Sequence, residues 1–496
     1  MKAKFSIKIL AGIMILGMLA SCSEDFLEEF PRLSQSDHLT LSTYDGLNSA
    51  TAGAYSNLCH TNWYGAGFVI TADLKGGNAK RGSVSSGRYI PEYFWINSPD
   101  QTSNLWTTAY NTIARANNVI NAIDAGFSDP TVDEADLNLL KAENLFLRAL
   151  AHFDMARMYC QPYSAGRDNM GVPVVLVTEN AYPARNTVGE VYDQVVQDLL
   201  DVIDLWPMSE ENPDEPISNP RGSDGAWATY WAAKALLAKV YLYMEDWPNA
   251  ASMANDVIEN GPFALFEEAE YTTWDNGGYW GDDPSVYGAG GDEIIFQVDG
   301  SEGNSAHGYW LAISYMVDPY GYGDIATSND LLNLYEAGDV RADLFQEPPE
   351  YPGEFWTLKY PGRMGREPRR EYNVPVLRLA EMYLIRAEAA LNGASGYNPL
   401  DDYNAIRTNR GLAAATSVSL TNIYAERRRE LCFEGNELFD LARTQRDLVR
   451  THYDGVENQN VEFVEGGTPL DNYLWAMPIP QAEIDANVNM EQNPGY

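Results

Sequence analysis

The feature that most constrains this fold is a pair of helical patterns joined by a short turn within residues 226–261. Apolar side chains recur at helical spacing in both halves: Tyr230, Leu237, Ala238 and Tyr241 in the first, and Ala250, Ala254, Val257 and Ile258 in the second. Asp246, Trp247 and Pro248 make the turn, where a proline loses no hydrogen bond because its missing N–H would be unpaired at a helix start. Each helix must bury one apolar stripe, so the chain is expected to pack helices in pairs.

The helix pair has the small residues that close packing requires. Ala238, Ala250 and Ala254 let the helices approach, and their spacing around Tyr241 resembles a tetratricopeptide repeat. One such unit cannot bury its own face, so several pairs must stack. Two further segments have an apolar stripe at helical spacing. In residues 146–160 the stripe consists of Phe146, Ala149, Leu150, Phe153, Ala156 and Cys160. In residues 377–391 it consists of Leu377, Ala380, Leu384, Ala387 and Leu391, and Gly393 is placed to end the helix.

Strand signals are few, and residues 292–298 (DEIIFQV) are the clearest of them. The sequence therefore predicts a mostly α fold. We expect a tetratricopeptide-like helical-repeat scaffold with long irregular loops and a few short strands.

The N-terminus has the pattern of a secretory signal that ends at a cysteine. Three lysines precede an apolar run, Ile9 to Ala20, that is too short to cross a bilayer as a stable helix. The small residues before Cys22 resemble the lipobox of bacterial lipoproteins, whose cysteine takes the lipid; the alternative is an ordinary cleavage site with a chance cysteine. The acidic stretch at residues 23–25 resembles an export signal of surface lipoproteins, or is a solvated tail. We expect a signal peptide at 1–21, a lipidated tether at 22–40 and a single domain at 41–496.

Composition argues against several classes of partner. The chain has 71 acidic and 33 basic residues, a formal charge of −38 at pH 7, and it loses three lysines with the signal. The negative electrostatic potential of such a chain repels nucleic acid and anionic lipid, so neither is an expected partner. Cys59, Cys160 and Cys432 have no disulfide or metal spacing and are expected to be buried apolar residues.

No catalytic signature stands out. The chain contains no HExxH, Walker-type glycine loop, GxSxG or paired CxxC, and no spacing among its acids singles out a pair for glycosidic cleavage. His152 lies among alanines and aromatics and is expected to be structural. Residues 281–284 (GDDP), with Asp275 and Asn276, offer oxygen ligands to calcium but lack the order of an EF-hand loop, so a plain turn is the simpler interpretation. We expect neither an enzyme nor a cofactor.

Aromatic residues are dense in the stretches expected to be irregular, which are residues 59–105, 267–330 and 346–373. Loops of this length are commonly functional, and their aromatic content argues against disorder. Aromatic faces suit sugars because pyranose C–H edges pack on the ring while hydroxyls bond to polar neighbours. The candidate ligand contacts are Trp63, Trp95, Trp274, Trp280, Tyr287 and Trp310, with Asn97, Arg81 and Arg88 as donors. The alternative is that these rings pack the loops onto the helices.

Several motifs, taken together and in order, resemble the SusD/RagB family of outer-membrane nutrient-binding lipoproteins along nearly the whole chain. They are LRALAHFDMARMYC (147–160), GVPVV (171–175), EIIFQV (293–298), LLNLYEAGDVRADLF (331–345), LKYPG (358–362), VLRLAEMYLIRAEAALN (376–392), AIRTNRGL (405–412), ERRRELCFEGNELFDLART (426–444) and PIPQAEIDANVNMEQNPGY (478–496). Any one of these motifs alone would be weak evidence.

The resemblance implies a lipid-anchored protein on the extracellular side of the outer membrane. Such a protein sits as a lid over a SusC-like TonB-dependent transporter, captures glycans for import and catalyses nothing. The repeats would face the transporter and the loops would hold the sugar, with Trp95 and Asn97 as the best correspondence. Because part of the family serves peptide uptake, the alternative is a peptide-binding RagB-like protein or a purely structural lid. The aromatic loops favour sugar, since peptide capture can use backbone pairing at a strand edge.

The charged signature at residues 426–444 has two interpretations. Arg427, Arg428 and Arg429 beside glutamates suggest a phosphate or carboxylate site. Alternating charges at helical spacing more often form structural ion pairs or a solvated face, and the family resemblance also favours structure.

Overall fold

The computed structural model describes residues 41–496 apart from 101–102, 180, 223–224, 272–279, 281–292, 301–313, 316–320, 361–371 and 452–459. Its longer helices are α3 (Tyr44–Leu58), α4 (Gly67–Gly76), α6 (Ser103–Asp124), α7 (Glu134–Tyr159), α8 (Val188–Leu205), α9 (Tyr230–Tyr243), α10 (Trp247–Asn260), α15 (Leu379–Leu391), α16 (Pro399–Asn409) and α17 (Leu420–Leu431). Its shorter helices are α5 (Ile90–Tyr93), α11 (Glu268–Tyr271), α14 (Asn329–Leu332), α18 (Glu437–Arg443) and α19 (Gln481–Ala486).

The strands are short and pair antiparallel, two by two. They are β1 (Ala79–Arg81) with β3 (Ile325–Thr327), β2 (Ile294–Val298) with β6 (Val374–Arg378), and β4 (Phe345–Gln346) with β5 (Trp356–Thr357). Within the described ranges, no helix is both long and apolar enough to span a membrane.

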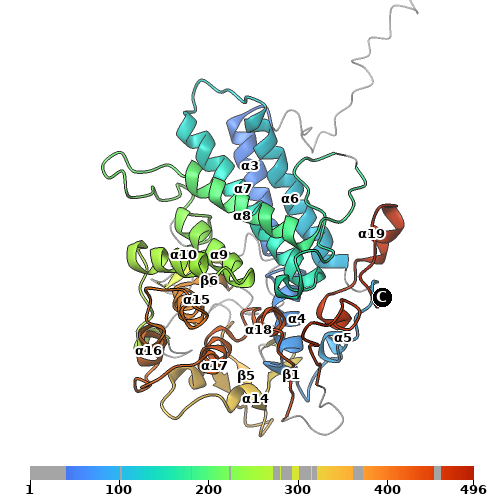
Figure 1. The fold of residues 1–496 in the computed structure, drawn as a ribbon, viewed down its shortest axis with the longest axis vertical. Coiled ribbons are helices and arrows are strands. Elements are labelled where there is room, and N and C mark those ends of the chain that lie inside the picture. Colours follow the sequence, from blue (N-terminus) through green and yellow to red (C-terminus); the bar gives the residue numbers. More distant parts are fainter. Residues whose placement is uncertain are drawn as a thin grey trace, which may run out of the picture.

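Apart from α4, the longer helices pack against one another in chain order. Each of α3, α6, α7, α8, α9 and α10 contacts the next, and α10 continues to α15, which contacts α16 and α17. Figure 1 shows α3, α6, α7 and α8 in the upper part of the molecule, α9 and α10 in the middle, and α15 to α17 below. The predicted fold class is confirmed: a mostly α, tetratricopeptide-like scaffold with few short strands.

The α9–α10 pair forms for the reasons that its sequence indicated. Ala238, Ala250 and Ala254 are fully buried between neighbouring helices. The Thr229 side chain accepts a hydrogen bond from Ala232 N at 3.0 Å and so caps α9. Asp246 caps α10 in the same way, which satisfies backbone donors that are otherwise free at a helix start.

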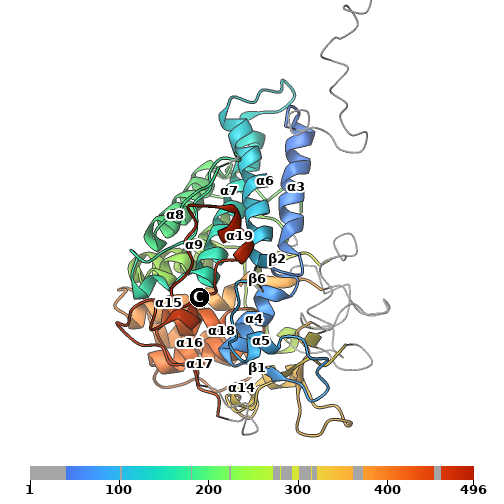
Figure 2. The ribbon, with the colours of Figure 1, turned by 90° about the vertical axis from the view of Figure 1, so that its right-hand side faces the viewer.

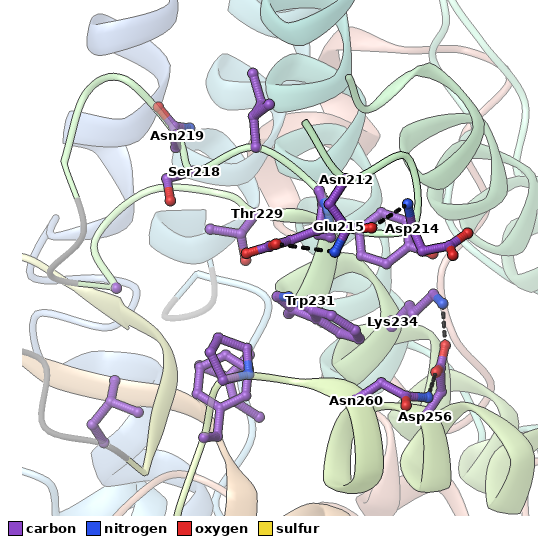
Figure 3. A pocket seen from close by; sticks show the side chains of 18 of the residues that line it. Asn212, Asp214, Glu215, Ser218, Asn219, Thr229, Trp231, Lys234, Asp256 and Asn260 are labelled. Carbon is purple, nitrogen blue, oxygen red and sulfur yellow. Dashed lines mark hydrogen bonds and ion pairs between the residues drawn. The ribbon is translucent and has the colours of Figure 1, made fainter. Parts of the chain in front are cut away.

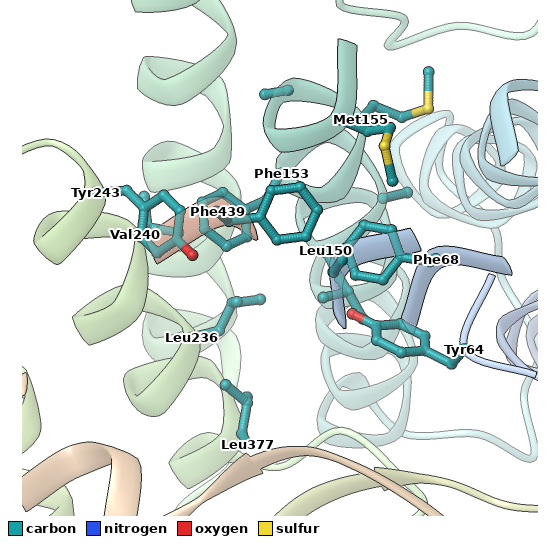
Figure 4. Close-up of a cluster of buried hydrophobic side chains, with 14 of the residues drawn as sticks. Tyr64, Phe68, Leu150, Phe153, Met155, Leu236, Val240, Tyr243, Leu377 and Phe439 are labelled. Atoms are coloured by element: carbon teal, nitrogen blue, oxygen red, sulfur yellow. The ribbon is translucent and has the colours of Figure 1, made fainter. Parts of the chain in front are cut away.

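The largest buried cluster joins helices that are far apart in sequence. Phe153 of α7 and Phe439 of α18 flank the Arg157 guanidinium, whose centre lies 4.5 and 4.8 Å from their ring centroids. Phe68 of α4 stacks on Phe439 at 5.2 Å, and Figure 4 shows these rings beside Tyr243 of α9. The cluster therefore fixes α4 and α18 to the helical scaffold.

Two elements differ from the sequence-based expectation. Leu377 was placed on a helical face, but it lies in strand β6, and α15 begins only at Leu379. Val374 and Val376 favour an extended backbone, and β6 pairs with the correctly predicted β2. The stretch at 59–105, expected to be irregular, contains α4, β1 and α5.

A set of fully or almost fully buried charges, which we call the buried ion network, links α17 to its surroundings. It consists of Glu293, Asp339, Arg341, Lys359, Arg378, Arg410, Glu426, Glu430 and Glu434. Glu430 lies at its centre, because it accepts hydrogen bonds from Arg378, Arg410 and Arg341. Arg427 pairs separately with Asp440 and Glu381. The structural interpretation of the charged signature is confirmed.

The three described cysteines are buried and free, as the sequence predicted. Burial raises the pKa of the Cys59 and Cys160 thiols to about 12. These side chains pack as small apolar groups.

Candidate functional site

Trp63, a predicted ligand contact, lies in the core. Its side chain is 0% exposed, and its Nε1 donates to Asp154 Oδ2 at 2.7 Å. The Tyr64 hydroxyl donates to the same oxygen at 2.7 Å, and Asp154 also pairs with Arg157. A fully covered ring cannot stack on a sugar, so in this structure Trp63 packs its loop against α7.

Trp95 and Trp280, two further predicted ligand contacts, are also buried. Trp95 is 3% exposed and meets Trp475 edge to face, with ring centroids 4.9 Å apart. Trp280 is 1% exposed and lies edge-on to Tyr360 at 6.3 Å. A lysine ammonium lies over each ring, Lys75 at 4.5 Å and Lys359 at 4.7 Å from the centroid. In this conformation these rings support the loops and present no open face to a ligand.

Asn97 fixes the segment that carries Trp95. Its Oδ1 accepts from Lys75 Nζ at 2.7 Å, and its Nδ2 donates to the Tyr496 hydroxyl at 2.6 Å and to Leu474 O at 3.3 Å. Burial lowers the pKa of Lys75 to about 7. Both polar atoms of Asn97 are engaged within the protein, so it acts as a brace beneath the segment.

Arg81 lies at the end of β1 and is half-buried. Its guanidinium centre is 6.0 Å from the ring centroid of Phe94. Because β1 pairs with β3, Arg81 stands opposite Ile325. The structure thus brings Arg81 close to the segment that holds Trp95 and Asn97.

Part of this region is a candidate ligand surface, the loop face, which we define as residues 83–97, residues 322–324 and Glu354. Tyr93, Trp95 and Asp324 are buried beneath its exposed side chains. The Arg88 guanidinium centre lies 4.5 Å from the Tyr322 ring centroid, and Tyr322 is 45% exposed. Asp324 accepts hydrogen bonds from Ser86 N at 2.6 Å and from Ser86 Oγ at 2.5 Å, and it pairs with Arg88 at 3.3 Å. An exposed ring beside charged and hydroxyl groups is the chemical make-up that sugar binding requires.

Pairing between distant segments holds the loop face together. Ala79 and Arg81 of β1 stand opposite Thr327 and Ile325 of β3. Ser83 donates from its N and Oγ to Glu354, at 3.2 and 2.6 Å. Figure 2 shows α5, β1 and α14 close together in the lower part of the molecule, on the side of α4.

Two aromatic residues on the loop face have left-handed backbones. Tyr89 (φ 60°) and Trp95 (φ 56°) stand on either side of α5. Such conformations cost a non-glycine residue about 1–3 kcal/mol and occur preferentially at ligand sites. The Tyr89 hydroxyl is 3.1 Å from Ser314 Oγ, which helps to hold the turn. The surroundings therefore impose a defined backbone here.

Some predicted residues fall outside the described ranges. They are Trp274, Asp275, Asn276, residues 281–284, Tyr287, Trp310 and the whole of residues 1–40 with Cys22. Conversely, sequence reasoning did not single out Tyr322 or Asp324, although both lie within residues 267–330, one of the stretches noted for its aromatic content.

No metal-binding cluster of three or more His, Cys, Asp or Glu side chains occurs among the described residues. His152 is structural, as expected: its Nε2 accepts from Val175 N at 3.3 Å, and its Nδ1 lies 3.1 Å from Arg148 O. Burial lowers the pKa of His152 to about 3, so its ring is neutral at physiological pH.

Comparison with known proteins gives two family matches along the chain. A family described as "SusD family" matches residues 350–496, and one described as "Starch-binding associating with outer membrane" matches residues 25–242.

Individual relatives agree with these matches. A SusD-like protein of Bacteroides ovatus is 24% identical over 473 residues, which cover 86% of this chain and 80% of that protein. The starch-binding protein SusD of Bacteroides thetaiotaomicron is 33% identical over 132 residues, or 25% of this chain and 22% of SusD. The crystal structure of a SusD superfamily protein from Bacteroides vulgatus has a TM-score of 0.77 at 28% identity and covers 91% of this chain and 98% of that chain.

Proposed function

Because the chain belongs to the SusD/RagB family, we propose that it is a surface-exposed, glycan-binding lipoprotein. It captures an oligosaccharide or polysaccharide at the loop face and delivers it to a partner SusC-like TonB-dependent transporter of the outer membrane. Cys22 carries the lipid, and residues 23–25 direct the protein to the extracellular side. The observation that carries the ligand assignment is the exposed Tyr322 ring beside Arg88 and Asp324, on a backbone fixed by β1–β3 pairing.

The chemistry of the loop face suits a neutral or weakly charged sugar. The Tyr322 ring offers an apolar surface for C–H edges, and the Arg88 guanidinium offers several N–H donors to hydroxyls. Asp324 is buried beneath them and fixes Arg88, so the donors are already oriented. An open surface buries few ligand atoms, so we expect dissociation constants per site on the order of micromolar to millimolar. Simultaneous binding of several sites along a long polymer would strengthen the overall binding.

Peptide capture, the alternative, has less support from the geometry. Strand addition needs an open strand edge. The edge of β3 away from β1 is already engaged, since Thr327 N donates to Phe355 O at 2.7 Å. This observation favours a sugar over an extended peptide at the loop face.

The test is a titration of the purified, unlipidated protein (Cys22→Ala) against a panel of polysaccharides and peptides. Tyr322→Ala should weaken binding of the best glycan by up to about tenfold, because an aromatic contact of this kind contributes about 0.5–1.5 kcal/mol. Tyr182→Ala is the matched control, because Tyr182 is 64% exposed and lies outside the loop face. Binding of peptides and of no glycan would favour the alternative, and equal binding by Tyr322→Ala and the parent would exclude the loop face as the site.

A further inference from the structure

We infer that a cavity beside α9 and α10, separate from the loop face, is a second binding site for a neutral sugar unit. We call it the helix-pair groove. Its volume is about 720 Å³, and its walls come from residues 212–222, the start of α9, the end of α10, Phe263 and the first residues of β2. No described loop-face residue lines it. The volume lies within the range of small-molecule sites.

The helix-pair groove has an aromatic wall. The rings of Tyr230 and Trp231 meet edge to face with centroids 5.1 Å apart, and both are half-buried. Figure 3 shows Trp231 projecting into the space between Thr229 and Glu215 on one side and Asn260 on the other. A partly open indole is the surface on which the C–H edge of a pyranose packs.

A polar group of three side chains stands beside this wall. Lys234 pairs with Asp256, and Asn260 Nδ2 donates to Asp256 Oδ1 at 2.6 Å. An ammonium, a carboxylate and an amide next to one another supply both donors and acceptors. Adjacent sugar hydroxyls, which both donate and accept, need this mixture. The Lys234 ammonium also lies 4.4 Å from the Tyr230 and 5.6 Å from the Trp231 ring centroid, so it joins the polar group to the aromatic wall.

The opposite wall is held in place without a ligand. An isolated bridge pairs Met208 with Pro216, and Ser209 N donates to Glu215 O at 2.7 Å. Trp206 Nε1 donates to Ile217 O at 3.0 Å and ties the loop to the end of α8. A wall fixed in this way needs little ordering when a ligand binds, so less affinity is lost.

Charge selects the class of sugar. The described lining contains three carboxylates, Asp214, Glu215 and Asp256, against one cation, Lys234, which is already paired. The excess of negative charge repels uronates and sulfated sugars and admits neutral units. The inference takes sugar as the ligand class from the proposed function, but it does not depend on the loop face.

The test combines calorimetry with hydrogen exchange on the Cys22→Ala protein. The probes are maltohexaose, laminarihexaose and xylohexaose, with a galacturonic acid hexamer as the anionic comparison. A neutral probe should slow exchange in residues 229–234 and 256–263, and the anionic hexamer should not. Trp231→Ala should weaken binding at this site by up to about tenfold, and the exposed Asn260→Ala should weaken it without risk to the core. Trp247→Ala, on the same helix pair but outside the lining, is the matched control.

The outcomes separate the two sites. Protection at the helix-pair groove that Tyr322→Ala leaves intact supports the inference, even if the loop face binds nothing. Protection confined to residues 83–97 and 322–324 overturns it and leaves the proposed function standing. The inference is also overturned if no neutral probe protects the groove, or if Trp231→Ala and Asn260→Ala both bind like the parent.

Discussion

Replacing Glu430 by glutamine tests whether the buried ion network stabilises the fold. The Glu430 carboxylate is fully buried and accepts from Arg378 at 2.6 Å, Arg410 at 2.9 Å and Arg341 at 2.8 Å. Glutamine keeps the size of the side chain but removes the negative charge, and its amide turns a donor toward a guanidinium. Three buried cations then lose a shared partner.

The expected loss follows from the behaviour of buried charge sets. Removing one partner of a buried ion pair costs about 3–5 kcal/mol, because the remaining charge is left uncompensated. At about 2.1 cal/mol/K per residue, a chain of this length has an unfolding entropy of roughly 1 kcal/mol/K near its midpoint. Glu430→Gln should therefore lower the melting temperature by about 3–5 °C at pH 7.

The ion pairs of Glu430 should also make the stability of the fold depend on pH. Burial alone raises the pKa of Glu430, but the guanidinium groups of Arg410, Arg378 and Arg341 outweigh it and hold the pKa well below 4.5. A carboxyl with a lowered folded pKa stabilises the protein above its unfolded pKa, and this stabilisation is lost as pH falls through the folded value. Below pH 4.5, the difference between the parent and Glu430→Gln should therefore shrink.

The assay is a set of thermal melts from pH 7 down to pH 3 for the parent, Glu430→Gln and Glu465→Gln. Glu465 is exposed, so its variant should melt like the parent. If Glu430→Gln melts within about 1 °C of the parent at pH 7, the reasoning on uncompensated buried charge is refuted.

Four further predictions concern the lipid anchor, the acidic stretch that follows it, catalysis and the buried Trp95 ring. Cys22→Ala should release the protein from the membrane fraction, and continued firm association would argue against lipidation there. Alanine at Ser23, Glu24 and Asp25 should keep the lipid but reduce protease access on intact cells; unchanged degradation would mean that the stretch is no export signal. The protein should cleave no glycan that it binds, and new reducing ends that scale with protein concentration and vanish on heating would contradict this. Trp95→Ala should lower the free energy of unfolding by about 3–5 kcal/mol in denaturant titrations, as for a core ring, whereas an unchanged value would mean that its burial contributes little.

Of the helices that the sequence predicted, α10 has one buried and one open face, whereas α7, α9 and α15 are buried nearly all round. In α10, Ala250, Ala254 and Val257 form the buried stripe, and the prediction of a helix there is confirmed. Helix α4 was missed because its ten residues, GFVITADLKG, include two glycines and three β-branched residues, which have low helix propensity. Leu377 was misassigned because its spacing fits the following helix, while pairing with β2 decides the backbone.

The candidate site was less predictable, because burial of a ring depends on residues remote in sequence. Trp95 is covered by Trp475, and Trp63 is engaged by Asp154. Nothing local to either tryptophan indicates these contacts. Composition located the aromatic region, but only the tertiary structure distinguishes the covered rings from the exposed Tyr322.

The hydrogen bond between α4 and the turn that joins α17 to α18 affects how this protein folds during synthesis. Asp73 Oδ1 accepts a hydrogen bond from Phe433 N at 2.8 Å, and the two residues are 360 positions apart in the sequence. Likewise, β1 cannot pair until β3 has been synthesised. At about 5–20 residues per second, a ribosome completes Phe433 roughly 20–70 s after Asp73. During that interval, the segment beneath the loop face lacks its partners and leaves apolar surface uncovered. Such long-range closure makes folding slow, and the uncovered apolar surface makes the unfinished chain prone to aggregation.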